Sequence, residues 1–337
     1  MLQSIDTREL IALDGLGGPI RGTFHRPQVR NSHPQTARNV RTPGILFLNS
    51  LSLPRAATGD SAVHWADSCA EWGYPSIRLD LPGLGDSAGE ITTDLLDLIN
   101  SGGYRSIVAA NVDELVERMG LAGVVIIGHC AGSVSALYAA AASRECKGLI
   151  LMDPYFHLPQ MIRPPMRRKL SEWARKSKIG GAASDIYDRW RDLLLLMRGE
   201  RLPGNANFQL LSSWKRVATT GMPILLLKAP GLKTAGTKSR VGQFDYLQHV
   251  TKLAGSKSQV TIKLIEGTDH SFANRVGRAA VRQQIGSWLE RYFPLAGSEE
   301  SAKGATKPTR ARDDQRDCIK RQRVSARVGC AAEGGSI

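Results

Sequence analysis

The feature that most limits the fold of this sequence is a series of short apolar runs separated by helical patterns. Most of these runs are rich in Val, Ile and Leu without strict alternation, which is typical of parallel strands buried on both faces. Parallel neighbours need a helical crossover between them, and such βαβ units are right-handed. The sequence therefore predicts an α/β protein with a mostly parallel central sheet flanked by helices. The runs are GILFLN (44–49), PSIRLD (75–80), GVVIIGH (123–129), KGLILM (147–152), PILLLK (223–228) and QVTIKLI (259–265).

The rhythm of strands and helices is interrupted once. Residues 155–221 contain only helical patterns, which predicts a helical cap inserted between two parts of the core, 1–154 and 222–294. Residues 295–337 are rich in Ala, Gly, Ser and mixed charges and have almost no large apolar side chains. Such a segment cannot bury a core, so we predict a disordered basic tail.

Composition narrows the class of protein. Hydrophobic residues make up 42% of the 337 residues, which is ample for a core. The five cysteines show no C-x-x-C spacing, so we predict neither a disulfide framework nor a zinc site, and expect no metal and no cofactor.

The first residues, MLQSIDTRELIALDG, lack the apolar segment of a signal peptide. The apolar stretch 124–143 is interrupted by His129, glycines and serines, so we expect no membrane segment and a cytoplasmic location.

One strand-to-helix junction carries an unusual residue pattern, VVIIGHCAGS, at 124–133. Cys130 occupies the centre of a G-x-[nucleophile]-x-G motif, the nucleophile elbow. A strained turn there lifts the central side chain clear of the backbone, and Gly128 and Gly132 leave room for the fold-back. The N–H of Ala131 and the positive end of the following helix would stabilise a thiolate and an oxyanion. A small buried cysteine without chemistry is the alternative.

A thiol nucleophile needs a base, and His270 is the best candidate. It lies in EGTDHSF, directly after the last strand and ahead of the last helix, where a loop can reach the end of the sheet that holds the elbow. His129 is predicted to point away from Cys130 if it ends the strand. The other histidines are predicted to serve on the surface or in packing, and they are His25, His33, His64, His157 and His249.

Four segments, in this order and spacing, resemble the α/β-hydrolase superfamily. They are LNS (48–50), RLDLPGLGDSAGE (78–90), GHCAGS (128–133) and EGTDHSFANRVGRAAVRQQIGSWL (266–289). More narrowly, they are similar to its serine-aminopeptidase-like or monoglyceride-lipase-like group, including hydrolases associated with exosortase systems. The resemblance covers about residues 8–293. It implies an α/β-hydrolase fold with a cap, and a catalytic set in the chain order nucleophile, acid, histidine.

The sequence departs from this family's pattern in two places at the reacting centre. Cysteine stands where the nucleophilic serine is usual, as in dienelactone hydrolases and polyhydroxyalkanoate synthases, which use a Cys-Asp-His set. The usual His-Gly of the oxyanion loop is Asn49-Ser50. The resemblance then implies Leu51 as the second main-chain oxyanion donor, beside Ala131.

The acid that should orient His270 is the third departure. No carboxylate directly follows PILLLK, where the family would place it, and the first one beyond is Asp245. Asp153, directly after KGLILM, is the other candidate. We favour Asp245 because it lies on the usual side of the cap insertion, whereas Asp153 precedes a proline and could simply end its strand.

Charge bears on the substrate. The formal net charge is +14, and residues 155–222 hold thirteen basic and five acidic side chains, an excess of eight in the cap region. A basic cap favours an anionic acyl donor, such as a coenzyme A or carrier-protein thioester or an anionic lipid. A solvated, ion-paired helix face is the alternative. The basic tail has no aromatic residue between Lys303 and Arg327, so nucleic acid is not an expected partner.

Together these features predict a hydrolase that cleaves an ester, thioester or amide of a small acyl substrate. Cys130 would form an acyl-enzyme, and His270 would act as base and then acid. Two alternatives remain open. One is an acyltransferase with the same thiol, and the other is an inactive hydrolase-fold binding protein, which the missing acid and altered oxyanion loop would suit.

Overall fold

The computed structural model describes residues 7–15, 17–28, 42–48, 50–158, 202–203, 205–230, 245–256 and 258–295. The chain divides into two units, Met1–Leu295 and Ala296–Ile337. All of the second unit and most of the predicted cap lie outside the described residues. The predicted disorder of the tail and the basic roof over the site therefore stay predictions.

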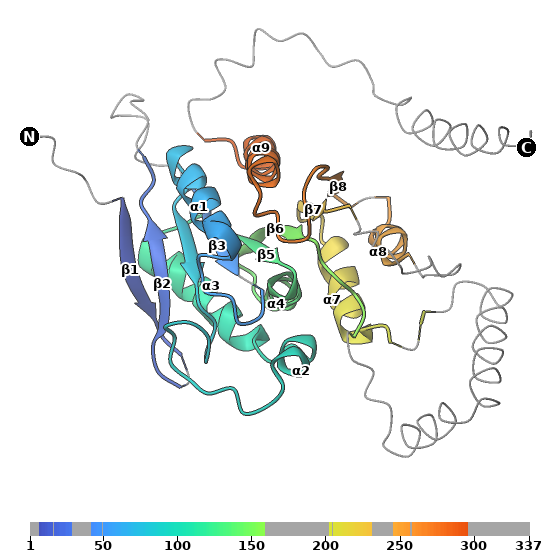
Figure 1. Ribbon diagram of the computed structural model, residues 1–337, viewed down its shortest axis with the longest axis horizontal. Coiled ribbons are helices and arrows are strands. Elements are labelled where there is room, and N and C mark those ends of the chain that lie inside the picture. Colours follow the sequence, from blue (N-terminus) through green and yellow to red (C-terminus); the bar gives the residue numbers. More distant parts are fainter. Residues whose placement is uncertain are drawn as a thin grey trace, which may run out of the picture. The chain divides into compact units, whose positions relative to one another are not determined.

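An eight-stranded sheet forms the centre of the first unit (Figure 1). Its strand order is β1-β2-β4-β3-β5-β6-β7-β8, and only β2 runs antiparallel to its neighbours. The predicted α/β fold with a mostly parallel sheet is therefore confirmed. The strands are β1 (Arg8–Leu13), β2 (Ile20–His25), β3 (Gly44–Leu48), β4 (Ser76–Leu79), β5 (Val124–His129), β6 (Cys146–Met152), β7 (Ile224–Lys228) and β8 (Val260–Leu264).

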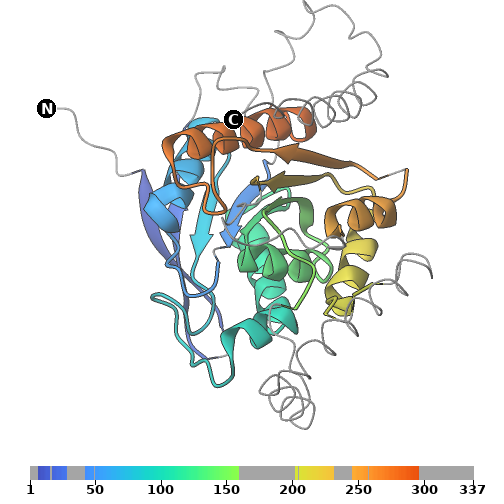
Figure 2. The same ribbon diagram turned by 45° about the vertical axis from the view of Figure 1, so that its right-hand side comes forward.

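Helices cover both faces of the sheet. α1 and α9 lie on one face, and α3, α4, α7 and α8 lie on the other (Figures 1 and 2). The short helix α2, which the sequence analysis did not predict, is capped by Asp94, whose side chain accepts the N–H groups of Leu96 and Asp97. The helices are α1 (Ser61–Glu71), α2 (Leu95–Asn100), α3 (Arg105–Met119), α4 (Ala131–Ala140), α7 (Phe208–Ala218), α8 (Tyr246–Ala254) and α9 (Arg275–Tyr292).

Successive side chains of each central strand enter opposite halves of the core. In β5, Val124 and Ile126 pack with the α3 and α4 side, whereas Val125 and Ile127 pack with the α1 and α9 side. All four are buried completely or nearly so. This explains the continuous apolar runs of the sequence, since both faces of a covered parallel strand need apolar side chains.

The helix α7 corrects the predicted extent of the cap. Residues 155–221 are predicted from the sequence to form the cap, yet α7 packs in the same apolar cluster as α4 and α8. Its residues Leu210, Trp214 and Val217 are buried, and the Trp214 indole N–H donates to the Val250 carbonyl at 2.8 Å. These buried positions recur at helical spacing, so α7 belongs to the helical layer of the core.

Five strands bring their carboxyl ends to one edge of the sheet. The register pairs Leu48 with Gly128, His129 with Met152, Met152 with Leu227, and Lys228 with Leu264. Residues that directly follow β3, β5, β6, β7 and β8 are therefore spatial neighbours. In open α/β sheets this edge is where ligands bind.

Candidate active site

Cys130 lies on a strained turn between β5 and α4. Its φ of 52° and ψ of −115° are unusual for a residue with a side chain. The turn needs a glycine at position 128, because a Cβ there would lie 2.4 Å from the Gly132 carbonyl oxygen. The Ser133 hydroxyl closes the turn by donating to the Gly128 carbonyl at 2.7 Å. This geometry is that of a nucleophile elbow.

The thiol of Cys130 contacts three polar groups. Burial raises its pKa, but hydrogen bonds with the side chains of His270 and Ser50 and with the N–H of Ala131 outweigh burial and lower the pKa below its ordinary value. The two other described thiols, Cys69 and Cys146, are buried, and burial raises the pKa of Cys146 to about 12. Cys130 is therefore the described cysteine that is best suited to react as a thiolate.

His270 connects the thiol to a carboxylate. Its Nδ1 hydrogen-bonds Oδ2 of Asp153, which leaves Nε2 for the bond with Cys130. The bond with Asp153, followed by the bond with Cys130, raises the pKa of His270 to about 10. The loop itself is held by His129, whose Nε2 lies 2.8 Å from the His270 carbonyl oxygen. Burial lowers the pKa of His129, so this ring is neutral and can donate to that carbonyl.

Of the two predicted acids, the structure brings Asp153 to His270 and not Asp245. Asp153 directly follows β6, is 7% exposed and has a φ of 48°. Asp245 is exposed at the start of α8, where its side chain accepts the Gln248 N–H at 2.9 Å. The preference for Asp245 is thus corrected: its carboxylate caps a helix, while the strand end after β6 places the other carboxylate beside the imidazole.

The sequence places Ser50 in the oxyanion loop without predicting its contact with the thiol, and it predicts no role for Lys228. Ser50 follows β3 and hydrogen-bonds the Cys130 thiol, and Lys228 ends β7 and pairs with Oδ1 of Asp153. Both stand at carboxyl ends of strands, which is the one signal in the sequence that could have identified them. The ion pair with Lys228 and the bond with His270 together lower the pKa of Asp153, although burial is the largest single contribution and raises it.

Backbone strain gathers around these side chains. Leu51, Cys130, Asp153 and Phe272 all have φ between 44° and 52°, in the left-handed region that side chains other than glycine rarely adopt. Each lies at a site residue or within two positions of one. Leu51, the second predicted oxyanion donor, is among them. Strain of this kind persists where surrounding structure enforces it, and it is common at active sites.

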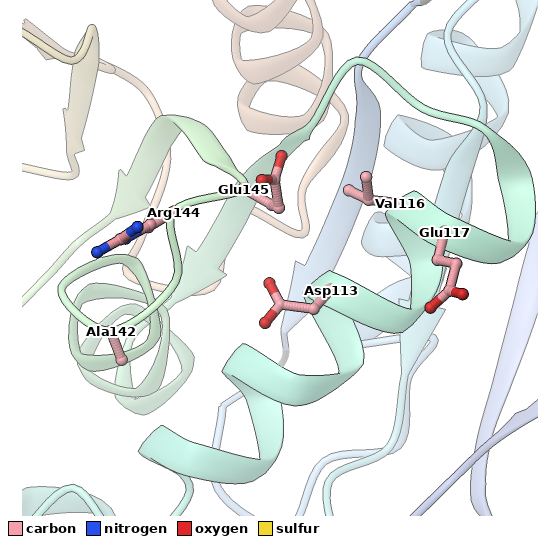
Figure 3. A pocket seen from close by; sticks show the side chains of 6 residues that line it. All are labelled: Asp113, Val116, Glu117, Ala142, Arg144 and Glu145. Atoms are coloured by element: carbon pink, nitrogen blue, oxygen red, sulfur yellow. The ribbon is translucent and has the colours of Figure 1, made fainter.

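A hollow lies away from this edge. It has a volume of 510 Å³ and opens between α3 and the loop from α4 to β6, at the amino end of β6 (Figure 3). The Cys130 site lies at the opposite, carboxyl end of the strands, so this hollow does not serve it. Its lining residues are Asp113, Val116, Glu117, Ala142, Arg144 and Glu145.

The described parts of the chain contain no cluster of three or more His, Cys, Asp or Glu side chains that could hold a metal ion. In the same parts, no helix is long and apolar enough to cross a membrane.

A family model decides what kind of protein this is. The model of the alpha/beta hydrolase fold matches residues 47–217, just over half of the chain. The chain belongs to the α/β-hydrolase family. The matched segment of this α/β-hydrolase begins in β3 and ends in α7, so it includes the elbow and Asp153. No curated protein matches the sequence.

Solved structures with a similar fold include esterases and other hydrolases. An esterase from Pyrococcus furiosus is 12% identical with a TM-score of 0.54, covering 85% of this chain and 91% of that one. The α/β hydrolase GrgF from Penicillium sp. is 15% identical with a TM-score of 0.53, covering 86% and 99%. Est1E from Butyrivibrio proteoclasticus, solved with ferulic acid, is 14% identical with a TM-score of 0.51, covering 84% and 98%. At these identities the similarity is one of fold.

Proposed function

We propose that this α/β-hydrolase cleaves an ester or thioester bond through a covalent intermediate on Cys130. One observation carries the proposal: the side chains of Cys130, His270 and Asp153 form a continuous chain of hydrogen bonds at the carboxyl edge of the sheet. The order thiol, imidazole, carboxylate is that of a nucleophile, a base and the group that orients the base.

In the first half of the reaction, the Cys130 thiolate attacks the carbonyl carbon and a C–S bond forms. The oxyanion that develops accepts hydrogen bonds from the N–H groups of Ala131 and Leu51. The bond to the leaving group then breaks, and His270 donates its Nε2 proton to the departing oxygen or sulfur. The acyl group remains on Cys130 as a thioester.

In the second half, water replaces the acyl group. Neutral His270 takes a proton from water at Nε2 as the hydroxide attacks the thioester carbonyl. The C–S bond breaks, the acid leaves, and the thiolate and imidazolium return to their starting states. Asp153 accepts the Nδ1 proton of His270 in a hydrogen bond throughout, so it holds the ring orientation and stabilises its charge.

Several features support an active enzyme over an inactive binding protein. The inactive alternative rested on a missing acid and an altered oxyanion loop, and the Asp153 carboxylate beside His270 supports the presence of an acid. The lowered pKa of Cys130 also favours thiolate chemistry. The esterases among the similar folds favour an ester-type bond, while an anionic acyl donor remains the proposed substrate class on the charge of residues 155–222.

The test compares wild type with Cys130→Ala on aryl esters of increasing acyl length and on acyl-coenzyme A thioesters. We expect hydrolysis by wild type and a loss of roughly 10³-fold or more in kcat/KM in the variant. Mass spectrometry of the quenched reaction should find the acyl group on the Cys130 peptide. Cys146→Ala, which removes a buried thiol at the far edge of the sheet, is the matched control and should keep activity. A Cys130→Ala protein with the wild-type rate would refute the proposal.

A further inference from the structure

We propose that Lys228 is a positioning residue of this site, which holds the Asp153 carboxylate and limits how strongly that carboxylate retains a proton on His270. The inference rests on the proposed roles of Cys130, His270 and Asp153. It adds a fourth charged group to them.

The geometry follows from the pairing of β6 with β7. Met152 pairs with Leu227, and the Asp153 N–H donates to the Leu227 carbonyl at 2.7 Å. Asp153 follows Met152 at the end of β6, and Lys228 follows Leu227 at the end of β7, so the two residues lie side by side. Lys228 Nζ contacts Oδ1 of Asp153, while Oδ2 of the same carboxylate contacts His270. Each carboxylate oxygen therefore has one cationic partner, which fixes the carboxylate plane.

Four groups then alternate in sign across the site: the Lys228 ammonium, the Asp153 carboxylate, the His270 imidazolium and the Cys130 thiolate. Without Lys228 the remaining three would carry one net negative charge, and the imidazolium would hold its proton more tightly. A cation next to Asp153 offsets part of that attraction. Asp153 is largely buried, with 8% of its side chain exposed, so the effect is screened less than at an open surface.

Other titratable groups face this cluster from the neighbouring elements. His129 contacts His270 from β5, and burial lowers its pKa, so it is uncharged at neutral pH. His157, after β6, has its pKa lowered by burial and by Lys228. Asp269 lies beside His270 in the same loop, where its carboxylate accepts bonds from Ser271. Among the described residues, Lys228 is the cationic partner of Asp153 besides His270.

The experiment follows the His270 ring by NMR titration in the Cys130→Ala background. This background removes the thiolate that supports the imidazolium, so the ring titration reports on Asp153 and its partners. We expect Lys228→Met to raise the titration midpoint by roughly half to one pH unit, a three- to tenfold gain in proton affinity. Lys228→Arg should stay near the parent value, and Lys228→Gln repeats the test with a polar side chain.

Lys147→Met is the matched control. Lys147 is 40% exposed against 39% for Lys228, and it pairs with Glu145 at the opposite edge of the sheet. Its removal deletes the same charge without touching the site. Equal midpoints in Lys228→Met and Lys147→Met, or a fall in the former, would overturn the inference. The NMR titration needs no turnover. If Lys228→Met shifts the His270 midpoint but the wild-type protein hydrolyses none of the substrates, the proposed function is rejected and the role of Lys228 is kept.

Discussion

Asp153 and Asp245 show how the same side chain takes different roles at different places in a fold. Asp245 begins a helix, and its carboxylate is already engaged by the Gln248 N–H. Asp153 leaves a central strand in a left-handed conformation, which turns its carboxylate toward His270. At this scale, the backbone position of each aspartate decides which group its carboxylate contacts.

A matched pair of amide substitutions tests this assignment. Asp153→Asn should lower both ester hydrolysis and the rate of Cys130 alkylation by iodoacetamide at neutral pH, by roughly 10²- to 10⁴-fold for hydrolysis, because a neutral amide cannot stabilise the imidazolium. Asp245→Asn should leave both rates unchanged, since asparagine caps a helix as well as aspartate does. Equal losses in the two variants would contradict the role given to Asp153.

At the scale of elements, the junction of β5 with α4 sets the position of Cys130, the proposed nucleophile. Gly128 is the last residue of β5 that pairs with β3. Its Cα faces the backbone of Gly132 and Ser133 in the first turn of α4. This close approach is what directs Cys130 outward at the head of the helix. The elbow therefore depends on a contact between two elements as much as on the nucleophile itself.

Gly128→Ala should disturb that contact. Its Cβ would meet the Gly132 carbonyl oxygen at 2.4 Å, so we expect a loss of about 1–3 kcal/mol in the free energy of unfolding and slower alkylation of Cys130.

Gly120→Ala is the control for this change. No atom lies within 4 Å of its Cβ position, but its φ of 62° costs about 1–2 kcal/mol for a side chain. It should therefore lose comparable stability while alkylation stays at the wild-type rate. Slower alkylation in both variants would mean that general destabilisation, and not the elbow, controls the thiol.

At the scale of the whole molecule, a buried histidine ties the antiparallel flank of the sheet to a helix. His25 ends β2 and is 1% exposed. Its Nδ1 lies 2.7 Å from Oδ1 of Asp67 on α1, and its Nε2 accepts from Nε of Arg78 on β4 at 2.8 Å. Burial, with a further contribution from Arg78, lowers the pKa of His25 to about 4. The network therefore requires a neutral ring.

Acid should weaken the fold through this group. The unfolded chain takes up the proton near pH 6.5 and the folded chain only near pH 4, so the stability present above pH 6.5 is lost as the pH falls through this window. The loss amounts to about 3 kcal/mol. Urea unfolding at pH 7 and pH 4 should show this loss of unfolding free energy in wild type. The same loss is expected in His64→Gln, which changes an exposed histidine of α1. In His25→Gln this part of the pH dependence should be absent, and an unchanged dependence would exclude His25 as its source.

The sequence by itself predicted the fold class, which is confirmed, and it proposed Cys130 and His270 as site residues from patterns that are local in the chain. Continuous apolar runs such as 124–129 are typical of parallel strands covered on both faces, and the pattern around Cys130 depends on glycines that are local in sequence. The loop of His270 was identified because it directly follows a strand, which is also a local property.

Only the tertiary structure decided which acid faces His270, that Ser50 contacts the Cys130 thiol, that Lys228 pairs with Asp153, and that α7 belongs to the core. Each of these depends on contacts between residues far apart in the chain: Lys228 and Asp153 are 75 positions apart, and His270 and Asp153 are 117. The parallel register places neighbouring strand ends side by side, and the order of residues along the chain does not show which strand ends become neighbours. The physical reason is that a sheet converts separation in sequence into adjacency at its edge.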